Sequence, residues 1–227
     1  MSAPKVWSKF SGSNGAKLVI STVPADRVGE AIDLHVNQYL QNDALSNALG
    51  LNKNKDAIEE YKNMIYQDSN ATIFVLVCGV DNGSGIGDIV GVSFSYLVTS
   101  DNPFEVPVPP KSKELQRLTE VSQAMHVADF MSVQKVDKYI DSFGIAIHPE
   151  YKDVGIEQEF LKARKLLAKD QGIPVTVGWM TTVALQNLAQ KEGYETFREM
   201  NYTEFGKTHG LTFENAPTTI KFMVAKV

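Results

Sequence analysis

The sequence contains a single cysteine, Cys78, among its 227 residues, so no disulfide can form within the chain. It also lacks a long apolar run. The longest one lies around residues 73–80 and is far shorter than the roughly 20 residues that a membrane-spanning helix needs. The first fifteen or so residues contain no apolar segment of the kind that a secretion signal requires. These absences predict a cytoplasmic protein that does not associate with membranes.

An excess of positive charge is also absent. The chain has 22 Lys and Arg residues against 27 Asp and Glu residues, and its formal net charge is −5. An acidic protein has no bulk attraction for nucleic acid or for an anionic membrane. The four histidines lack the mutual spacing of a metal site. We therefore expect a small molecule as the partner, no nucleic acid, no membrane and no bound metal, and a monomer or weak dimer.

One stretch, residues 139–172, has a clear local pattern. Its first part alternates apolar residues with small or polar ones, as a β-strand does: Phe143, Ile145 and Ile147. Its second part carries an apolar stripe at helical spacing over residues 156–168, and Gly172 suits a left-handed cap after the helix. The sequence therefore predicts strand, turn and helix. Gly155 lies at the helix start, where backbone N–H groups and the helix dipole favour a phosphate.

The rest of the chain alternates short apolar segments with amphipathic ones. Strands are expected at residues 17–21, 71–80, 89–97, 143–147 and 174–179, from residue 193, and at residues 218–224. Helices are expected at residues 26–40, with Asp26 as the N-cap or with a start one or two residues earlier, and at residues 55–67, 114–129, 156–171 and 181–190. This order predicts one mixed α/β domain over residues 1–227.

Two loops are also expected. The glycine-rich residues 81–88 precede a strand and not a helix, so they predict a hairpin turn rather than a nucleotide-binding fingerprint. The proline-rich residues 99–113 predict a loop that is inserted into the domain. They do not mark a domain boundary, because the elements before them are too few to form a core of their own.

Four separated segments occur in the order known from one protein family. They are residues 39–45 (YLQNDAL), 89–92 (IVGV), 148–156 (HPEYKDVGI) and 181–194, followed by NYTEF at 201–205. Together they resemble the insect arylalkylamine N-acetyltransferase-like branch of the GNAT superfamily. Residues 152–157 fall on its acetyl-coenzyme A loop, Gln/Arg-x-x-Gly-x-Gly/Ala. The resemblance covers nearly the whole chain. It implies the GNAT fold, in which helices flank a twisted, mostly antiparallel sheet with one splayed pair of parallel strands.

This resemblance implies an acetyl-CoA-dependent N-acetyltransferase that acts on an arylalkylamine or a related small amine. Acetyl-CoA would lie between the strands at 143–147 and 175–179, with its diphosphate against the first amides of the next helix. The implied cofactor-binding residues are Ile145, Ala146, Ile147, Lys152, Asp153, Val154, Gly155, Ile156, Glu157 and Gln158. The cations Lys152, Lys162, Arg164 and Lys165 can neutralise the diphosphate, although a solvent-exposed helix face is the simpler role for them.

The resemblance also implies the catalytic residues, Asp43 and Thr181. Asp43 takes the place of the general base, where the family has glutamate. Aspartate keeps the carboxylate that accepts the proton of the amine, and a water can span its shorter reach. Equally, Asp43 can simply cap the chain before residues 45–51. Of the family's two hydroxyl positions, Thr181 keeps a hydroxyl, whereas Leu185 can only pack.

The residues implied to contact the amine are Tyr39, His35, Trp179, Met180, Leu185 and Tyr202. Core packing explains the aromatic ones nearly as well, and a core or surface position is the simpler interpretation of His35. Cys78 lies in an apolar strand with no basic neighbour in sequence, so we expect an inert core residue rather than a nucleophile.

Two functions from different classes remain. The intact frame, together with Gly155, Asp43 and Thr181, favours an active acetyltransferase. Glu157, Leu185 and Ala44 depart from the family at positions where its choice has a physical reason. They favour a catalytically degenerate protein of the same fold that binds or stores a ligand. We favour the enzyme.

Overall fold

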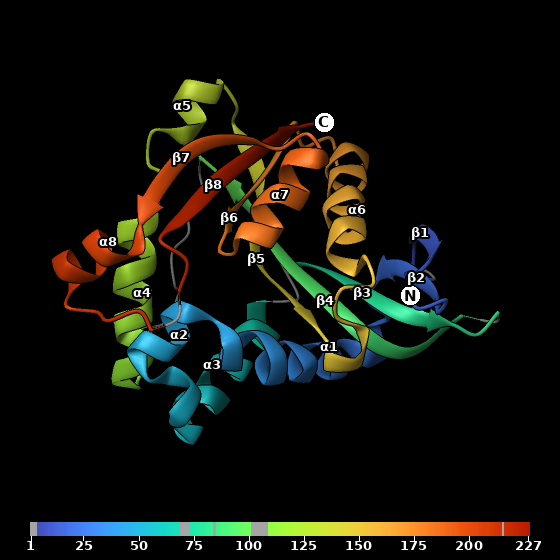
Figure 1. The fold of residues 1–227 in the computed structure, drawn as a ribbon, viewed down its shortest axis with the longest axis horizontal. Coiled ribbons are helices and arrows are strands. Elements are labelled where there is room, and N and C mark those ends of the chain that lie inside the picture. Colours follow the sequence, from blue (N-terminus) through green and yellow to red (C-terminus); the bar gives the residue numbers. More distant parts are fainter. Residues whose placement is uncertain (1–3, 69–72, 84, 101–108, 215) are drawn as a thin grey trace.

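The computed structural model describes residues 4–68, 73–83, 85–100, 109–214 and 216–227. Its centre is an eight-stranded sheet with helices on both faces (Figure 1). The strands are β1 (Val6–Ser11), β2 (Lys17–Thr22), β3 (Ile73–Asp81), β4 (Ile86–Thr99), β5 (Lys138–Ile147), β6 (Val175–Met180), β7 (Glu195–Asn201) and β8 (Thr219–Lys226). They lie side by side in the order β1-β2-β3-β4-β5-β6-β8-β7.

Neighbouring strands in this sheet run antiparallel, with the exception of β5 and β6, which are parallel. Two residue pairs join β5 to β6: Ile140 with Thr176, and Asp141 with Val177. Beyond these pairs the two strands separate, while β6 stays paired along its other edge with β8. The expected mostly antiparallel sheet with a splayed parallel pair is therefore confirmed.

Helices form the layers above and below this sheet. The α-helices are α1 (Val28–His35), α2 (Ala44–Leu49), α3 (Lys55–Asp68), α4 (Lys113–Met125), α5 (Phe130–Gln134), α6 (Ile156–Asp170), α7 (Val183–Lys191) and α8 (Tyr202–His209). Shorter turns are the 3-10 turns η1 (Ala25–Arg27), η3 (Leu51–Lys53) and η4 (Pro149–Tyr151), and a π-helical turn, η2 (Val36–Leu40). Helices α6 and α7 pack on one face, and α1 and α3 form the layer on the other (Figure 1).

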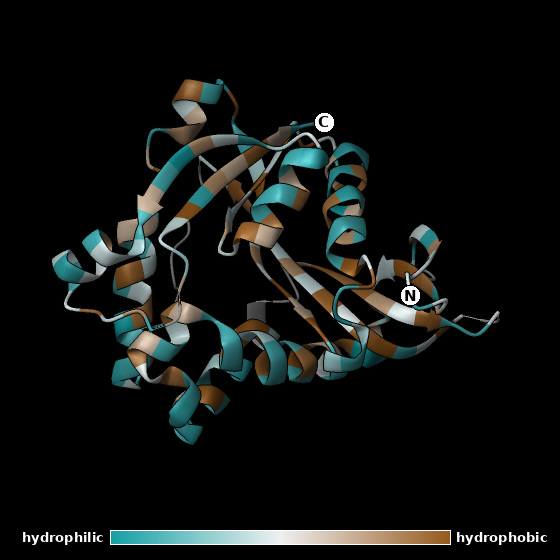
Figure 2. Cartoon of the chain, viewed as in Figure 1, coloured by the Kyte–Doolittle hydropathy of each residue, from teal (hydrophilic) through white to brown (hydrophobic). Residues whose placement is uncertain are grey.

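Two apolar cores join these layers to the sheet. The core beneath α1 and α3 includes Ile32, Leu40, Tyr61, Val92 and Phe94. The core beneath α6 includes Leu18, Ile20, Ile140, Phe160 and Leu167. Hydrophobic and hydrophilic residues interleave along α6 and the strands, as expected for elements with one buried side (Figure 2). At Gly91 of β4 a Cβ would lie 3.1 Å from the Phe160 ring, so glycine lets α6 approach the sheet closely.

Several element bounds differ from the expected ones. Asp26 does not cap the first helix: the caps of η1 and α1 are Pro24 and Arg27, and neither makes a side-chain capping bond. Helix α7 is capped by Thr182 and does not begin at Thr181. The elements β1, α2, α5 and α8 were not expected, because they are short and carry little periodicity. Gly172 has a φ of 61°, which confirms the expected left-handed cap.

The two expected loops are only partly covered by the structure. β3 ends at Asp81 and the antiparallel strand β4 begins at Ile86, so the described residues 82, 83 and 85 lie in the hairpin connection that was expected within residues 81–88. Most of the proline-rich insertion, residues 101–108, lies outside the described residues. So does the start of the expected strand at residues 71–80.

Candidate active site

A cleft of about 1300 Å³ lies where β5 and β6 separate. It brings together most of the residues that the sequence indicated: Tyr39, Asp43, Ile145, Ala146, Ile147, Lys152, Asp153, Gly155, Glu157, Trp179, Met180, Thr181, Leu185 and Tyr202. The side chains that do not line it are those of His35, Val154, Ile156 and Gln158. The cleft therefore joins the gap in the sheet to the start of α6 and to the cap of α2.

A β-bulge in β5 shapes the wall of this cleft. The pairing of β5 with β4 shifts register between Phe94 and Ser95, which leaves Phe143 as the extra residue. The next residue, Gly144, has a φ of 126°, and a Cβ there would lie 2.7 Å from Cε2 of Tyr39. Position 144 therefore requires glycine, and the Tyr39 ring lies directly against the strand at the bulge.

The start of α6 forms another part of the cleft. Gly155 is the N-cap of α6 with a φ of 97°, and nothing lies within 4 Å of the place where its Cβ would be. Its neighbours Val154 and Ile156 are buried in the core beneath α6. The loop is thus anchored on both sides while the glycine faces open space. Because the first N–H groups of a helix have no intrahelical acceptor, this end of α6 suits an anion such as a diphosphate.

Glu157 places a carboxylate at this same helix end. Its side chain lines the cleft. Burial raises the pKa of the Glu157 carboxyl, while a hydrogen bond from its own backbone N–H opposes that rise. The charge of Asp153 raises this pKa further, and the charge of Lys152 lowers it. The carboxylate therefore competes for a donor that an anionic ligand would use.

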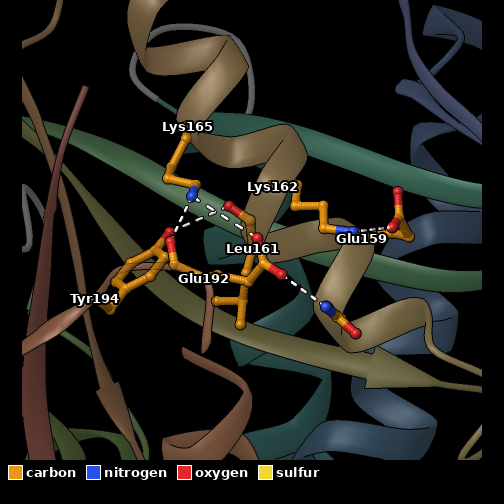
Figure 3. Close-up of polar contacts among 7 residues, drawn as sticks. Glu159, Leu161, Lys162, Lys165, Glu192 and Tyr194 are labelled. Carbon is orange, nitrogen blue, oxygen red and sulfur yellow. Dashed lines mark hydrogen bonds and ion pairs between the residues drawn. The ribbon is translucent and has the colours of Figure 1, made fainter. Parts of the chain in front are cut away.

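Two of the lysines on α6 form ion pairs with glutamates of the same chain. Lys162 pairs with Glu159 at 2.7 Å, and Lys165 lies 3.8 Å from the Glu192 carboxylate. Gln158 donates its side-chain amide to the same Glu192 at 2.7 Å. Figure 3 shows these contacts. Lys162, at 42% exposed, thus fits the solvent-exposed helix face that was its simpler interpretation, and Lys165 is half-buried against Glu192, whereas Lys152 lines the cleft.

Asp43 caps helix α2 and lines the cleft at the same time. Its Oδ2 accepts hydrogen bonds from Ser46 N at 2.8 Å and from Ser46 Oγ at 2.9 Å. Burial raises the pKa of the Asp43 carboxyl, and the bonds from Ser46 and from the Tyr39 hydroxyl oppose that rise. Burial, and then the charge of Asp43, raise the pKa of Tyr39, Tyr61 and Tyr202. The position of Asp43 is compatible with both expected roles.

Asp141 and Tyr96 line the cleft although the sequence analysis did not indicate them. Asp141 belongs to the last residue pair between β5 and β6, and its Oδ2 accepts a hydrogen bond from the Tyr96 hydroxyl at 3.0 Å. Burial raises the pKa of Asp141 to about 6, against the opposing effects of that bond and of the Arg164 charge. A carboxylate with such a pKa can accept a proton from a substrate. The signal in the sequence was an acidic residue within a mostly apolar strand.

Arg164 fits neither of the roles expected for it. It is 1% exposed, so it does not belong to a solvent-exposed helix face. It lies roughly 13–14 Å along α6 from the glycine cap, too far for the diphosphate end. Its Cζ lies 5.9 Å from the centre of the Tyr194 ring, and its side chain lines the cleft. The spacing of the buried stripe gave the signal, since Arg164 follows Phe160 by one helical turn.

His35 is a core residue and does not contact the cleft. It is fully buried, and its ring stacks on Tyr39 with centroids 4.8 Å apart. Its Nε2 lies 3.2 Å from the Tyr61 hydroxyl oxygen. Burial lowers the pKa of His35 to about 3, so the ring is neutral. The expectation of a substrate contact is therefore wrong for His35, which instead supports the Tyr39 ring from behind.

Side chains from β6 and α7 form one wall of the cleft and also pack against the core. Thr181 is half-buried and lies between the two elements, while Thr182 caps α7 by accepting a hydrogen bond from Leu185 N at 3.1 Å. Trp179 and Leu185 are half-buried, whereas Met180 is 2% exposed. The same side chains thus serve the core and the cleft wall.

The cysteine of this chain is not placed to act as a nucleophile. Cys78 is fully buried, and burial raises the pKa of its thiol to about 12, as expected for an inert core residue. Among the described residues, no three or more His, Cys, Asp or Glu side chains group in a way that could hold a metal ion. Of the helices that the structure describes, none has the length and apolar character needed to cross a bilayer.

No protein-family model matches the sequence, and no curated protein sequence matches it. Solved structures do match it. A protein of the yellow fever mosquito Aedes aegypti, assigned as arylalkylamine N-acetyltransferase 7, has a TM-score of 0.85 at 20% identity, over 99% of this chain and 96% of that one. The Drosophila melanogaster polyamine N-acetyltransferase, which forms N-acetylagmatine, has a TM-score of 0.72 at 12% identity, over 92% and 100%.

A bacterial structure extends this similarity. A Salmonella typhimurium protein assigned as an acetyltransferase, solved with its cofactor acetyl-CoA, has a TM-score of 0.53 at 12% identity, over 92% of this chain and 93% of that one. These identities are low, so the similarity concerns the arrangement of the elements. The splayed strand pair, the glycine-capped helix beside it and these superpositions lead to one conclusion: the chain has the fold of the GNAT acetyltransferases.

Proposed function

We propose that the protein is an N-acetyltransferase that moves the acetyl group of acetyl-CoA to a small amine of the arylalkylamine type or a related one. One observation carries the proposal: the gap between β5 and β6 meets a glycine-capped helix start and a half-buried carboxylate, Asp43, in a single cleft. The names of the similar solved structures support it, since two are named for acetyl transfer to amines and one contains acetyl-CoA.

The chain's own residues fit acetyl-CoA at both ends of the gap. Beyond Asp141 and Val177 the facing edges of β5 and β6 are no longer paired with each other, so they can bond an extended, amide-containing ligand. Gly155 leaves open space beside the first N–H groups of α6. When bound, acetyl-CoA supplies the activated acetyl thioester. The protein then holds the amine beside that group, which raises their effective concentration.

The net charge of the cleft suits a cationic amine. The carboxylates that line it are Asp43, Asp141, Asp153, Glu157 and Glu214. The lysines and arginine that line it are Lys53, Lys152 and Arg164. This excess of carboxylates attracts a protonated amine. The rings of Tyr39, Tyr202 and Trp179 offer apolar surface for an arylalkyl chain.

Asp43 is the residue that we propose as the general base. An amine is mostly protonated near pH 7 and can attack a thioester only after it loses that proton. Ser46 fixes the Asp43 carboxylate in place, and burial raises its pKa, which makes it a better proton acceptor. The C–N bond then forms as the C–S bond breaks, and the products are the amide and a free thiol. Thr181, on the opposite side of the gap, can hold a water or the departing sulfur.

A second function is favoured by the carboxylate of Glu157. It accepts a backbone hydrogen bond at the start of α6, where a diphosphate needs the donors. Such a carboxylate weakens the binding of an anion and is better tolerated in a protein that binds or stores a ligand without turnover.

The release of free thiol from acetyl-CoA tests the proposal directly. The assay uses a panel of tryptamine, dopamine and agmatine, and a calorimetric titration with acetyl-CoA accompanies it. We expect binding, and thiol release with at least one amine. Binding without release for any amine would support the second function. No heat at millimolar acetyl-CoA would contradict the proposal.

A further inference from the structure

Arg164 has no role in the acetyl transfer proposed above. It is the largest fully buried side chain, at 1% exposed, and it lines the cleft. Within the part of the chain that the structure describes, none of its guanidinium nitrogens, Nε, Nη1 and Nη2, has a hydrogen-bond partner. Arginine remains ionised in proteins, and a buried ion is costly unless it is paired. Such a charge points to a partner that the cleft receives.

The guanidinium lies at the narrow end of the gap between the strands. The last pair between β5 and β6 is Asp141 with Val177, so Ser142 and Gly178 are the first residues beyond it. A Cβ at Gly178 would lie 3.7 Å from Nη1 of Arg164 and 2.7 Å from Cβ of Ser142. A larger residue at 178 would fill the space in front of the guanidinium, which glycine keeps clear.

The neighbours of Arg164 leave its N–H edge unmatched. The Tyr194 ring lies 5.9 Å from Cζ, so it contacts the guanidinium through its π-face and accepts no hydrogen bond from it. Asp141 lies near enough for the charge of Arg164 to lower the pKa of its carboxyl. The Asp141 carboxylate nevertheless accepts the Tyr96 hydroxyl and makes no hydrogen bond with Arg164.

The chemistry of the missing partner follows from the shape of the guanidinium. Arginine presents its N–H groups as a planar fork that matches the two oxygens of a carboxylate. A lone carbonyl oxygen matches only part of that fork, and an acetyl methyl group matches none of it. The diphosphate of a coenzyme A thioester belongs at Gly155, at the far end of the gap. The anion that can reach Arg164 is therefore one at the end of the acyl chain.

We infer that Arg164 binds a terminal carboxylate of the acyl group. The cleft thus takes coenzyme A thioesters of dicarboxylic acids, such as malonyl-CoA and succinyl-CoA, more tightly than neutral acyl thioesters. The inference rests on the proposed function, because it requires the thioester to lie in the gap between β5 and β6. It goes beyond that function by adding a class of acyl thioester that the cleft binds more tightly than a neutral one such as acetyl-CoA.

Calorimetric dissociation constants test this preference without relying on turnover. Bare coenzyme A, butyryl-CoA, malonyl-CoA and succinyl-CoA are titrated into the wild type and into Arg164→Met, which keeps side-chain length and removes the charge. Lys162→Met is the matched control, since Lys162 is on the same helix and pairs with Glu159. We expect the wild type and the control to bind at least one carboxylated thioester about tenfold or more tightly than butyryl-CoA. Arg164→Met should lose this preference and still bind bare coenzyme A as the wild type does.

Each result has a distinct meaning. Equal affinity of the wild type for carboxylated and neutral thioesters, or an unchanged preference in Arg164→Met, overturns the inference and leaves the proposed function intact. Failure of the wild type to bind bare coenzyme A removes both. If circular dichroism shows that Arg164→Met is unfolded, Arg164→Lys replaces it. That variant keeps the charge but not the fork, so it should reduce the preference, and a full preference there contradicts the inference.

Discussion

Asp43 and Asp141 bring carboxylates into the same cleft from different kinds of structure. Asp43 is the cap of a helix, and its Oδ2 accepts two hydrogen bonds from Ser46. Asp141 lies within a strand and accepts one from the Tyr96 hydroxyl. Burial raises the pKa of both carboxyls, but Asp43 has more donors that oppose the rise. Both aspartates can accept a proton, but only Asp43 also caps a helix.

This difference decides how each residue has to be tested. Replacing Asp43 by alanine removes a helix cap and a possible base together, so the two losses cannot be separated. Replacing Asp141 leaves every helix cap intact, and its chief structural effect is on the pH dependence of stability. The substitutions below are chosen to separate these roles.

The largest effect is expected at Asp43. Asp43→Asn keeps an oxygen that can cap α2 but cannot accept a proton. We expect kcat/KM to fall by about 10²-fold, with about tenfold as the smallest fall that fits a general base, and the free energy of unfolding to stay nearly unchanged. Asp43→Ala should lose as much activity and in addition about 1 kcal/mol of unfolding free energy. Thiol release and urea unfolding measure the two quantities. Full activity in Asp43→Asn would restrict Asp43 to the capping role.

The next effect concerns Asp141 and pH. Its pKa is about 6 in the folded protein against an ordinary 3.8, so the folded state holds this proton more tightly than the unfolded state. The contribution of Asp141 to the free energy of unfolding is fully present below about pH 4 and is lost as the pH rises to about 6. Its size is at most about 3 kcal/mol, the equivalent of two pKa units. Asp141→Asn should remove this loss and unfold at higher urea than the wild type at pH 7, but not at pH 4. Parallel pH profiles of the two proteins would contradict the raised pKa.

Glu157 offers a smaller effect at the other end of the cleft. Glu157→Gln removes a negative charge from the start of α6, and the affinity for coenzyme A should rise by about tenfold or less, since a like-charge contact near a surface costs on the order of 1 kcal/mol. Glu159→Gln is the control, because Glu159 pairs with Lys162 and does not line the cleft. Calorimetry gives both values. A Kd that stays the same or weakens in Glu157→Gln would show that Glu157 does not oppose the diphosphate.

The smallest effect is expected at two neighbouring threonines. Thr182→Ala removes the cap of α7 and should cost about 1 kcal/mol of stability with little change in turnover. Thr181→Ala should leave stability nearly unchanged and lower kcat by a few-fold, since one positioning hydroxyl contributes about 1 kcal/mol. The reverse pattern would mean that Thr181 is the structural residue of the pair.

The sequence predicted the fold well where the pattern was long and regular. The alternation before His148 and the apolar stripe after Gly155 indicated β5 and α6, and Gly172 takes the left-handed conformation that its position predicted. The short elements β1, α5 and α8 have too few turns or alternations to show a period. They are specified by packing against the sheet instead, as Phe130 of α5 is against Tyr139 and Phe222.

The site was predictable only where a motif or a resemblance marked it. Asp43 and Thr181 came from the resemblance, whereas Asp141 belongs to no motif. The bulge at Phe143 shifts the faces of β5, so Phe143 packs on the core beneath α1 and α3 whereas Ile145 and Ile147 pack on the core beneath α6, and alternation along the strand does not show this change of face. Arg164 was grouped with the neighbouring lysines as a cation for the diphosphate or for the solvent-exposed helix face. The residue type alone does not show that this position of α6 is buried.

A crystal structure with coenzyme A tests the central claim most directly. We predict electron density for the ligand in the gap between β5 and β6. The diphosphate should lie against the first amides of α6 at Gly155, and the thiol should point towards the part of the cleft that holds Asp43 and Asp141. Density for coenzyme A on any other surface of the protein, or an empty gap in crystals grown with saturating ligand, would contradict the account.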